Sequence, residues 1–186
     1  MKKAILVAMC TALMISCASV PKDFTDPRDG KTYKAVKIGE QIWLAENLNY
    51  YAKGSKCYDD NPDNCTKYGR LYNWNTAMKA CPDGWHLSSD KEWQTLMDFA
   101  GGDYVAGKKL KAKNGWNDDN GTSGNGTDDY SFSALPGGYG LHKDKFISAG
   151  DLGRWWSVGE HENSGYAADQ DNYDKSFLQS VRCLKD

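Results

Sequence analysis

Cysteines constrain what this chain of 186 residues can fold into more than any other feature. Two of them, Cys10 and Cys17, lie in or beside an N-terminal segment with the features of an export signal. The remaining four, Cys57, Cys65, Cys81 and Cys183, are an even number in an exported chain, which predicts two disulfides. Three pairings are possible. We favour Cys57–Cys65, which closes a short polar loop, and Cys81–Cys183, which ties the end of the chain to its middle. A zinc site is not expected, because no C-x-x-C pair occurs.

The N-terminus has the pattern of a secretory signal. Two lysines precede the apolar run Ala4–Ile15, which is shorter than the roughly 20 residues of a membrane-spanning helix. A small residue, Ser16, comes before Cys17, as in bacterial lipoproteins whose cysteine is acylated after cleavage. We therefore predict a signal peptide over residues 1–16 and a lipidated tether over 17–23. The alternative is an ordinary signal peptide in which Cys17 is incidental.

The residue after Cys17 and the charge balance limit the location and the partners. Ala18 is not the Asp that retains Gram-negative lipoproteins at the inner membrane, so we expect an exported protein at the outer membrane or cell surface. A periplasm-facing position is the alternative. The membrane is then contacted through the N-terminal lipid. With 23 basic and 25 acidic residues, the chain lacks the excess of positive charge that is typical of nucleic-acid-binding proteins and of polybasic membrane patches.

The rest of the chain predicts one domain over residues 24–186. Strands are expected at Lys31–Ile38 and Gln41–Ala45, around a turn at Gly39-Glu40, because apolar residues alternate there. Ser89 and Glu92 form the capping box of a helix that ends at Gly101-Gly102.

Weaker signals fill in the remainder of this domain. A short helix is expected within Arg70–Ala80, polar turns over Lys53–Thr66 and a long surface loop over Asn114–Asp129. Short strands are expected near Phe132, Phe146, Trp155-Trp156 and Ser180–Leu184. The fold class is therefore α+β: a single loop-rich domain with short antiparallel strands and one or two main helices.

Several motifs resemble a known family. Cys81–Leu96 (CPDGWHLSSDKEWQTL), Phe132–Tyr139 (FSALPGGY), Arg154–Glu160 (RWWSVGE) and Ser180–Asp186 (SVRCLKD) together resemble the Fibrobacter succinogenes major paralogous domain. Val36–Tyr50 and Lys67–Trp74 resemble it as well. The resemblance implies an exported protein, often a lipoprotein, and brings no established activity.

A second, more distant resemblance concerns the fold. Trp85–Trp93 and the terminal Val181-Arg182-Cys183 are similar to signatures of formylglycine-generating-enzyme-like domains, although Ser88 stands where that signature has Pro. The resemblance implies a C-type-lectin-like fold. It does not imply the copper oxidase chemistry, because that needs two nearby cysteines and Cys183 stands alone in its part of the chain.

No pattern selects an enzyme. There is no G-x-S-x-G and no H-E-x-x-H motif, and the three histidines, His86, His142 and His161, are scattered. We expect no catalysis and no resident cofactor. The alternative is a carbohydrate-active enzyme with a glycosidase pair such as Asp144 and Glu160.

The long loop is the candidate metal site. Its oxygen-bearing side chains, which Ca²⁺ prefers, are Asp118, Asp119, Asn120, Asp128 and Asp129. The loop also contains Trp116-Asn117-Asp118, a triplet that C-type lectins use for calcium. The EF-hand spacing is absent, and a solvated loop is the alternative reading.

Three aromatic residues are the candidate ligand-binding residues: Tyr139, Trp155 and Trp156. Aromatic rings can stack on the C–H face of a sugar. Because adjacent residues of a strand point to opposite sides, at least one of the two Trp rings is expected in the core. The sequence therefore predicts a non-catalytic cell-envelope protein that binds carbohydrate, with an extracellular polysaccharide or an envelope protein as its partner. A structural or protein–protein module of an envelope assembly is the alternative.

Overall fold

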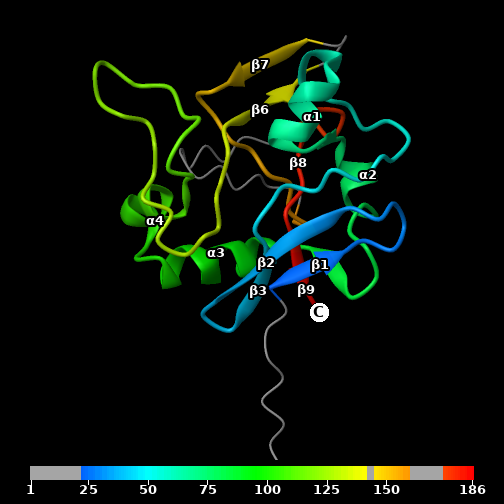
Figure 1. Cartoon of the computed structure of the whole chain (residues 1–186), viewed down its shortest axis with the longest axis horizontal. Coiled ribbons are helices and arrows are strands. Elements are labelled where there is room, and N and C mark those ends of the chain that lie inside the picture. Colours follow the sequence, from blue (N-terminus) through cyan, green and yellow to red (C-terminus); the bar gives the residue numbers. More distant parts are fainter. Residues whose placement is uncertain (1–21, 142–144, 160–173) are drawn as a thin grey trace, which may run out of the picture.

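The computed structural model describes residues 22–141, 145–159 and 174–186. Its main element is a five-stranded antiparallel sheet with the strand order β1-β2-β3-β9-β5 (Figure 1). The strands are β1 (Asp23–Thr25), β2 (Thr32–Ile38), β3 (Gln41–Leu44), β9 (Cys183–Lys185) and β5 (Trp85–Leu87). The last strand of the chain thus lies between two segments from its first half.

Two small antiparallel sheets form the other half of the molecule. One pairs β4 (Leu71–Tyr72) with β8 (Gln179–Ser180), and the other pairs β6 (Gly137–Gly140) with β7 (Phe146–Ala149). The helices are the short 3₁₀ turn η1 (Tyr58–Asp60) and α1 (Pro62–Tyr68), α2 (Trp74–Ala77), α3 (Asp90–Phe99) and α4 (Asp103–Leu110). This arrangement is a single α+β domain with antiparallel sheets and few helices, as the sequence predicted.

The β2–β3 hairpin and α3 form where the local sequence predicts them. Tyr33, Ala35 and Ile38 are the buried positions of β2, and Gly39 takes a positive φ of 59° in the turn. At the start of α3 the Ser89 side chain accepts from the backbone N–H of Glu92, and the Glu92 carboxylate accepts from the backbone N–H of Ser89. This capping box satisfies two backbone donors that a helix start otherwise leaves free.

Two hydrophobic clusters fill the domain. One surrounds Trp156 and Tyr72, and includes Cys183. The other surrounds Trp43, Trp93 and Phe132 and lies under α3 and α4. Their aromatic rings contact one another at tilted or edge-to-face angles, for example Trp43 and Trp93 with centroids 4.9 Å apart. The many aromatic residues of the sequence thus serve mainly as core.

Both favoured disulfides are present. Cys57 is bonded to Cys65 and Cys81 to Cys183. The second bond joins the C-terminal strand β9 to the segment just before β5. Disulfides persist in oxidising compartments, which agrees with an extracytoplasmic domain. Among the described residues, no helix has the length and apolar character that crossing a membrane requires.

Three local expectations need correction. The segment Lys53–Thr66, expected as turns, contains most of α1, because Asn61 caps the helix with its side chain and Pro62 occupies its first turn. The expected helix Arg70–Ala80 is divided into the strand β4 and the single turn α2. Near Phe132 and near Trp155-Trp156 there is no regular strand, but only isolated bridges, which join Lys111 to Ala134 and Trp155 to Ser180.

A histidine links β5, α3 and the chain end, and predicts a pH dependence of stability. The His86 Nδ1 lies 2.6 Å from Asp186 Oδ1, and its Nε2 lies 3.1 Å from Glu92 Oε1. Burial lowers the pKa of His86, but the hydrogen bonds with the two carboxylates outweigh burial and raise it above 6.5. For Glu92, burial raises the pKa, while the hydrogen bonds from Ser89 and His86 outweigh it and bring the pKa below 4.5.

The two shifts set the direction of the effect. The stabilisation by His86 is complete below pH 6.5 and is lost as pH rises through the higher folded-state pKa, whereas that by Glu92 is lost at acid pH. We expect thermal denaturation to give a higher melting temperature at about pH 5.5 than at about pH 8, by a small margin because the pair is partly exposed. In His86→Gln this difference should shrink. An equal pH dependence in the variant would contradict the assignment to His86.

Candidate functional site

An open groove of about 690 Å³, lined by polar and apolar groups in similar amounts, lies between the β2 side of the main sheet and the end of α1. One wall, the β2 wall, comes from Lys31, β2 and the segment 45–49, which follows β3. The other comes from the last residues of α1 and from the segment 128–135. We call it the central groove. Its polar and charged lining residues are Lys31, Thr32, Lys34, Glu46, Asn47, Asn49, Thr66, Lys67, Asp128, Ser131 and Ser133.

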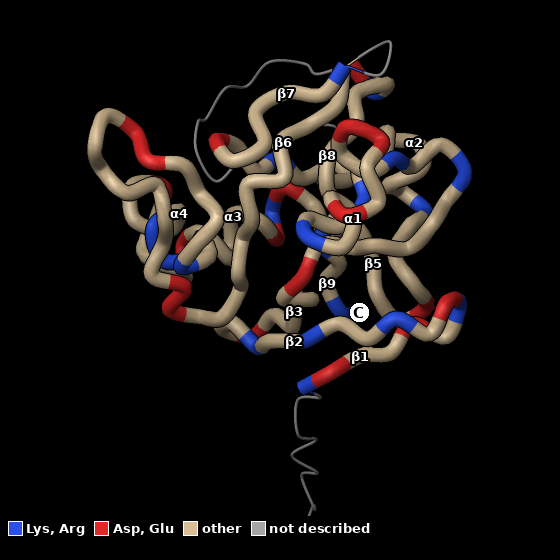
Figure 2. Tube along the Cα trace, turned by 45° about the horizontal axis from the view of Figure 1, so that its top comes forward, with Lys and Arg blue, Asp and Glu red and all other residues tan. Residues whose placement is uncertain are grey.

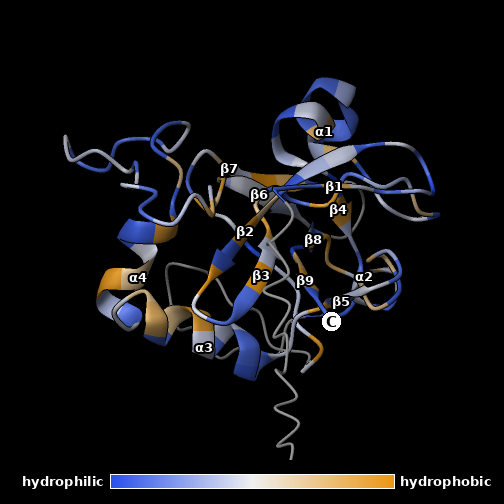
Figure 3. Cartoon of the chain, turned by 60° about the horizontal axis from the view of Figure 1, so that its bottom comes forward, coloured by the Kyte–Doolittle hydropathy of each residue, from blue (hydrophilic) through white to orange (hydrophobic). Residues whose placement is uncertain are grey.

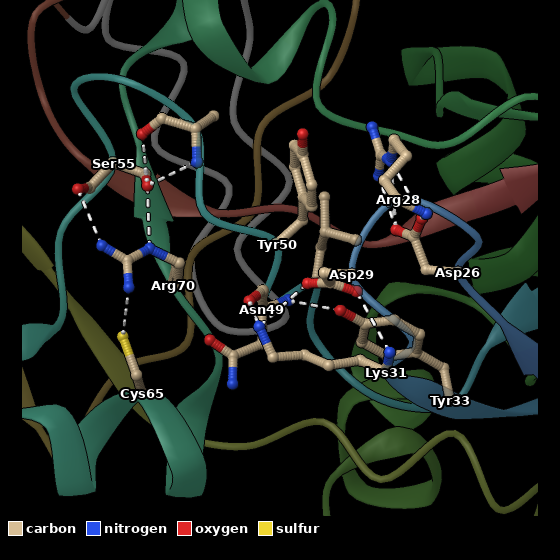
Figure 4. A network of polar contacts seen from close by, with 12 residues as sticks. Asp26, Arg28, Asp29, Lys31, Tyr33, Asn49, Tyr50, Ser55, Cys65 and Arg70 are labelled. Carbon is tan, nitrogen blue, oxygen red and sulfur yellow. Dashed lines mark hydrogen bonds and ion pairs between the residues drawn. The ribbon is translucent and has the colours of Figure 1, made fainter.

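The β2 wall is held by a hydrogen-bonded network (Figure 4). The Asn49 backbone N–H donates to the Tyr33 hydroxyl at 3.1 Å, and Lys31 Nζ donates to the Asn49 carbonyl at 2.7 Å. Lys31 also pairs with Asp29 at 2.9 Å. Burial raises the pKa of Tyr33 to about 12, so its hydroxyl stays neutral at physiological pH. This wall is therefore fixed, and Lys31 is already neutralised.

The α1 wall rests on Arg70 and the first disulfide. Arg70 Nε donates to Ser55 Oγ at 2.8 Å, and its Nη2 donates to the Ser55 carbonyl at 3.0 Å. Its Nη1 lies 3.4 Å from Cys65 Sγ. Gly69 closes this wall with a φ of 77°, where a Cβ would lie 2.8 Å from that of Asn47. The end of α1 is thus fixed against the 45–49 segment.

The third segment is a tight turn closed by one carboxylate. Asp128 accepts from the Ser133 backbone N–H at 2.8 Å and from the Ser133 hydroxyl at 2.7 Å. Asp128, Ser131 and Ser133 all have φ near +50°, between 49° and 56°. Such left-handed conformations are unfavourable for residues other than glycine and persist where the surroundings impose them. The turn therefore presents its hydroxyl groups to the groove in a fixed geometry.

The buried lining residue Asn47 forms the floor of the groove and belongs to a buried polar node. Asn47 Oδ1 accepts from Arg182 Nη2 at 2.7 Å and Nε at 3.1 Å, and from Trp155 Nε1 at 2.8 Å. Arg182 Nη1 donates to the carbonyls of Leu44 and Phe132 at 3.1 and 2.6 Å. The Arg182 side chain is fully buried, and burial lowers its pKa to about 9. All its hydrogen-bond acceptors are neutral.

This arrangement suits hydrogen bonding better than bond cleavage. The groove offers amines, amides, hydroxyls and two carboxylates, Glu46 and Asp128, to a ligand. Glu46 Oε2 accepts from the Lys34 backbone N–H at 3.0 Å, and both Asp128 oxygens are bonded to Ser133. Basic positions lie along β2 and beside α1 (Figure 2). Within the described ranges, no group of three or more His, Cys, Asp or Glu side chains could hold a metal ion.

The aromatic residues singled out from the sequence do not line this groove. Trp155 and Trp156 are 2% and 0% exposed, so neither ring has a face free for a sugar. This corrects the expectation that one of them is a ligand platform. Tyr139 is half-buried, and the Arg154 guanidinium lies 4.1 Å from its ring centroid.

The residues proposed for calcium do not converge either. Asp118, Asp119 and Asn120 lie in a separate exposed turn, in which the backbones of Asp119 and Thr122 bond to each other. Asp128 belongs to the groove wall, and Asp129 is exposed. Cys17, His142, His161, Asp144 and Glu160 lie outside the described residues, so their predicted roles stay predictions.

An exposed tyrosine near the α1 wall escaped the sequence reasoning. Tyr51 is 67% exposed, and the Arg70 guanidinium lies 5.0 Å from its ring centroid. Tyr51 follows Tyr50, and the Arg28 guanidinium lies 3.8 Å from the centroid of the Tyr50 ring. The signal was available: two adjacent tyrosines stand at the start of a polar stretch, where no core pattern requires both.

The comparison with family models identifies the chain. It belongs to the Fibrobacter succinogenes major domain family, whose model matches residues 36–185. The matched region runs from within β2 to the end of β9, so it includes the segments 45–49 and 128–135 and the end of α1, but not the groove residues 31–34. No curated protein and no solved structure matches the chain.

Proposed function

We propose that this protein is a non-catalytic binding module of the cell envelope and that its ligand is carbohydrate, bound in the central groove. The observation that carries the proposal is the groove itself, with its rigid walls and many hydrogen-bonding side chains. Sugars present hydroxyl groups that both donate and accept, and amide, amine, hydroxyl and carboxylate groups in fixed positions can match them. Walls that are already fixed reduce the entropy lost on binding.

The envelope location and the lectin-like fold belong to the same proposal. The two disulfides support an extracytoplasmic position, and acylation of Cys17 would attach the chain to the membrane by its N-terminal lipid. The two motifs that carry the distant lectin-like resemblance lie side by side as β5 and β9, and Cys81–Cys183 joins them. This adjacency supports a C-type-lectin-like origin of the domain.

A glycan array probed with the purified protein, with and without Ca²⁺, tests the proposal. Thr66→Trp places a bulky ring in the groove from the exposed face of α1 and should abolish glycan binding. Thr95→Trp is the matched control, since Thr95 is also an exposed helical threonine whose hydroxyl bonds the carbonyl four residues earlier, but on α3. Absence of binding to every plant-wall and bacterial glycan would reject the carbohydrate reading. Binding that survives Thr66→Trp would place the site elsewhere.

A protein–protein module is the second candidate, and one surface favours it. Phe99 at the end of α3 and Tyr104 and Val105 in α4 are exposed hydrophobic residues close together in the chain. Apolar positions are visible on both helices (Figure 3). Exposed apolar patches commonly mark sites of protein contact. Failure of the glycan array would move the proposal to this surface.

A further inference from the structure

The charge of the central groove differs in sign from that of the whole chain. The protein has a formal net charge of −2, yet three lysines and only two carboxylates line the groove. Arg182 lies one residue layer below the floor, and Asp29 pairs with Lys31 at the edge. With these two included, four cationic groups face three carboxylates.

The cations differ in how far they are already neutralised. Lys31 is paired with Asp29. Lys34 and Lys67 are exposed, and neither has a carboxylate within ion-pair distance in the part of the chain that the structure describes. Lys34 lies on the β2 wall and Lys67 on the α1 wall, so an elongated ligand between the walls could meet both ammonium groups.

The floor adds a second and independent source of positive potential. A fully buried guanidinium is costly unless an anion is near, and the hydrogen-bond acceptors of Arg182 are an amide oxygen and two backbone carbonyls. Its carboxylate neighbours Glu46 and Asp128 act at longer range, and their oxygens accept hydrogen bonds from Lys34 N–H and Ser133. Charges in a low-dielectric interior act over longer distances than charges in water.

We infer that the ligand of the central groove is an acidic sugar, in which a carboxylate recurs among hydroxyl groups. This inference rests on the proposed function and names its ligand class. The carboxylate would lie between Lys34 and Lys67, above the Arg182 node. The hydroxyl groups would bond to Asn49, Ser131 and the other neutral lining groups.

Matched ligands separate charge from sugar recognition. The probes are galacturonate oligomers and the same oligomers with every carboxylate methyl-esterified, measured by titration calorimetry at constant ionic strength. We expect the acid to bind about tenfold more tightly than the ester, and its affinity to fall as salt is raised. Lys34→Gln and Lys67→Gln should each weaken binding of the acid roughly threefold, as for exposed ion pairs, and weaken binding of the ester by a smaller factor.

Lys91→Gln on α3 is the control, because it removes an exposed lysine that does not line the groove. Equal affinity for acid and ester, or equal loss in all three lysine variants, would overturn the inference and leave carbohydrate binding standing. Preference for the ester or for neutral glycans would overturn it likewise. Absence of binding to all glycans would instead reject the proposed function, and the inference with it.

Discussion

The double variant Cys81→Ala with Cys183→Ala should lose roughly 4–5 kcal/mol of unfolding free energy, the largest effect that we expect from removing one covalent bond. The disulfide closes a loop with a sequence separation of 102, so its removal releases much chain entropy in the unfolded state. Cys183 is also fully buried in β9, which is the strand that joins β3 to β5. Loss of this bond therefore weakens the centre of the main sheet.

The second disulfide provides the internal control. Cys57–Cys65 spans a sequence separation of only 8, for which the same entropy argument gives about 2–3 kcal/mol. Urea denaturation of the two double variants and the unaltered protein, all oxidised, measures the difference. Equal losses in the two variants would show that strain or unfolded-state structure, and not loop length, determines the contribution of each bond.

Much of the fold could be predicted because its signals are local. The β2–β3 hairpin follows from alternation around Gly39, and α3 follows from Ser89 and Glu92, which meet only three residues apart. The parts that were missed had weaker or conflicting signals. Lys53–Thr66 has a polar composition, which is typical of turns. The helix-start signal of Asn61 and Pro62 within it is weaker than that composition. The helix α4 starts at Asp103, after Gly102, which has no side chain to cap it, so no local sequence signal predicts its start.

The two tryptophans show a different limit. Alternation correctly predicts that Trp155 and Trp156 point to opposite sides of the chain. Trp155 belongs to the cluster with Trp93, and Trp156 belongs to the cluster with Tyr72. Both sides of this segment are therefore core, which depends on how distant segments fold against it. The sequence pattern holds no information on that point.

The central groove was beyond sequence reasoning for a similar reason. Its walls come from β2, the segment 45–49, the end of α1 and the segment 128–135, and no one of these has a motif for binding. The node beneath it joins Asn47 to Arg182, which are 135 residues apart. The motif Val181-Arg182-Cys183 resembles a family signature, but the sequence does not reveal its structural role. Arg182, just before β9, connects this strand to the floor of the groove through Asn47.

Replacement of Arg182 by Met should destabilise the protein by about 3 kcal/mol or more. Met fills a similar volume, but it leaves Asn47 Oδ1 with fewer donors and the carbonyls of Leu44 and Phe132 without this partner. Buried acceptors that lose their donor retain their full desolvation cost. Arg182→Lys should lose a comparable amount, because an ammonium group cannot reproduce the planar fork that reaches three separate acceptors.

Denaturant unfolding with Lys185→Met as control checks this prediction. Lys185 lies on β9, three residues after Arg182, but is exposed, so its replacement should change the unfolding free energy by less than about 1 kcal/mol. If Arg182→Met is neutral or stabilising, the cost of burying the guanidinium cancels the benefit of its four hydrogen bonds. The arginine would then be dispensable for folding, and its position below the groove floor would have to be explained by ligand binding alone.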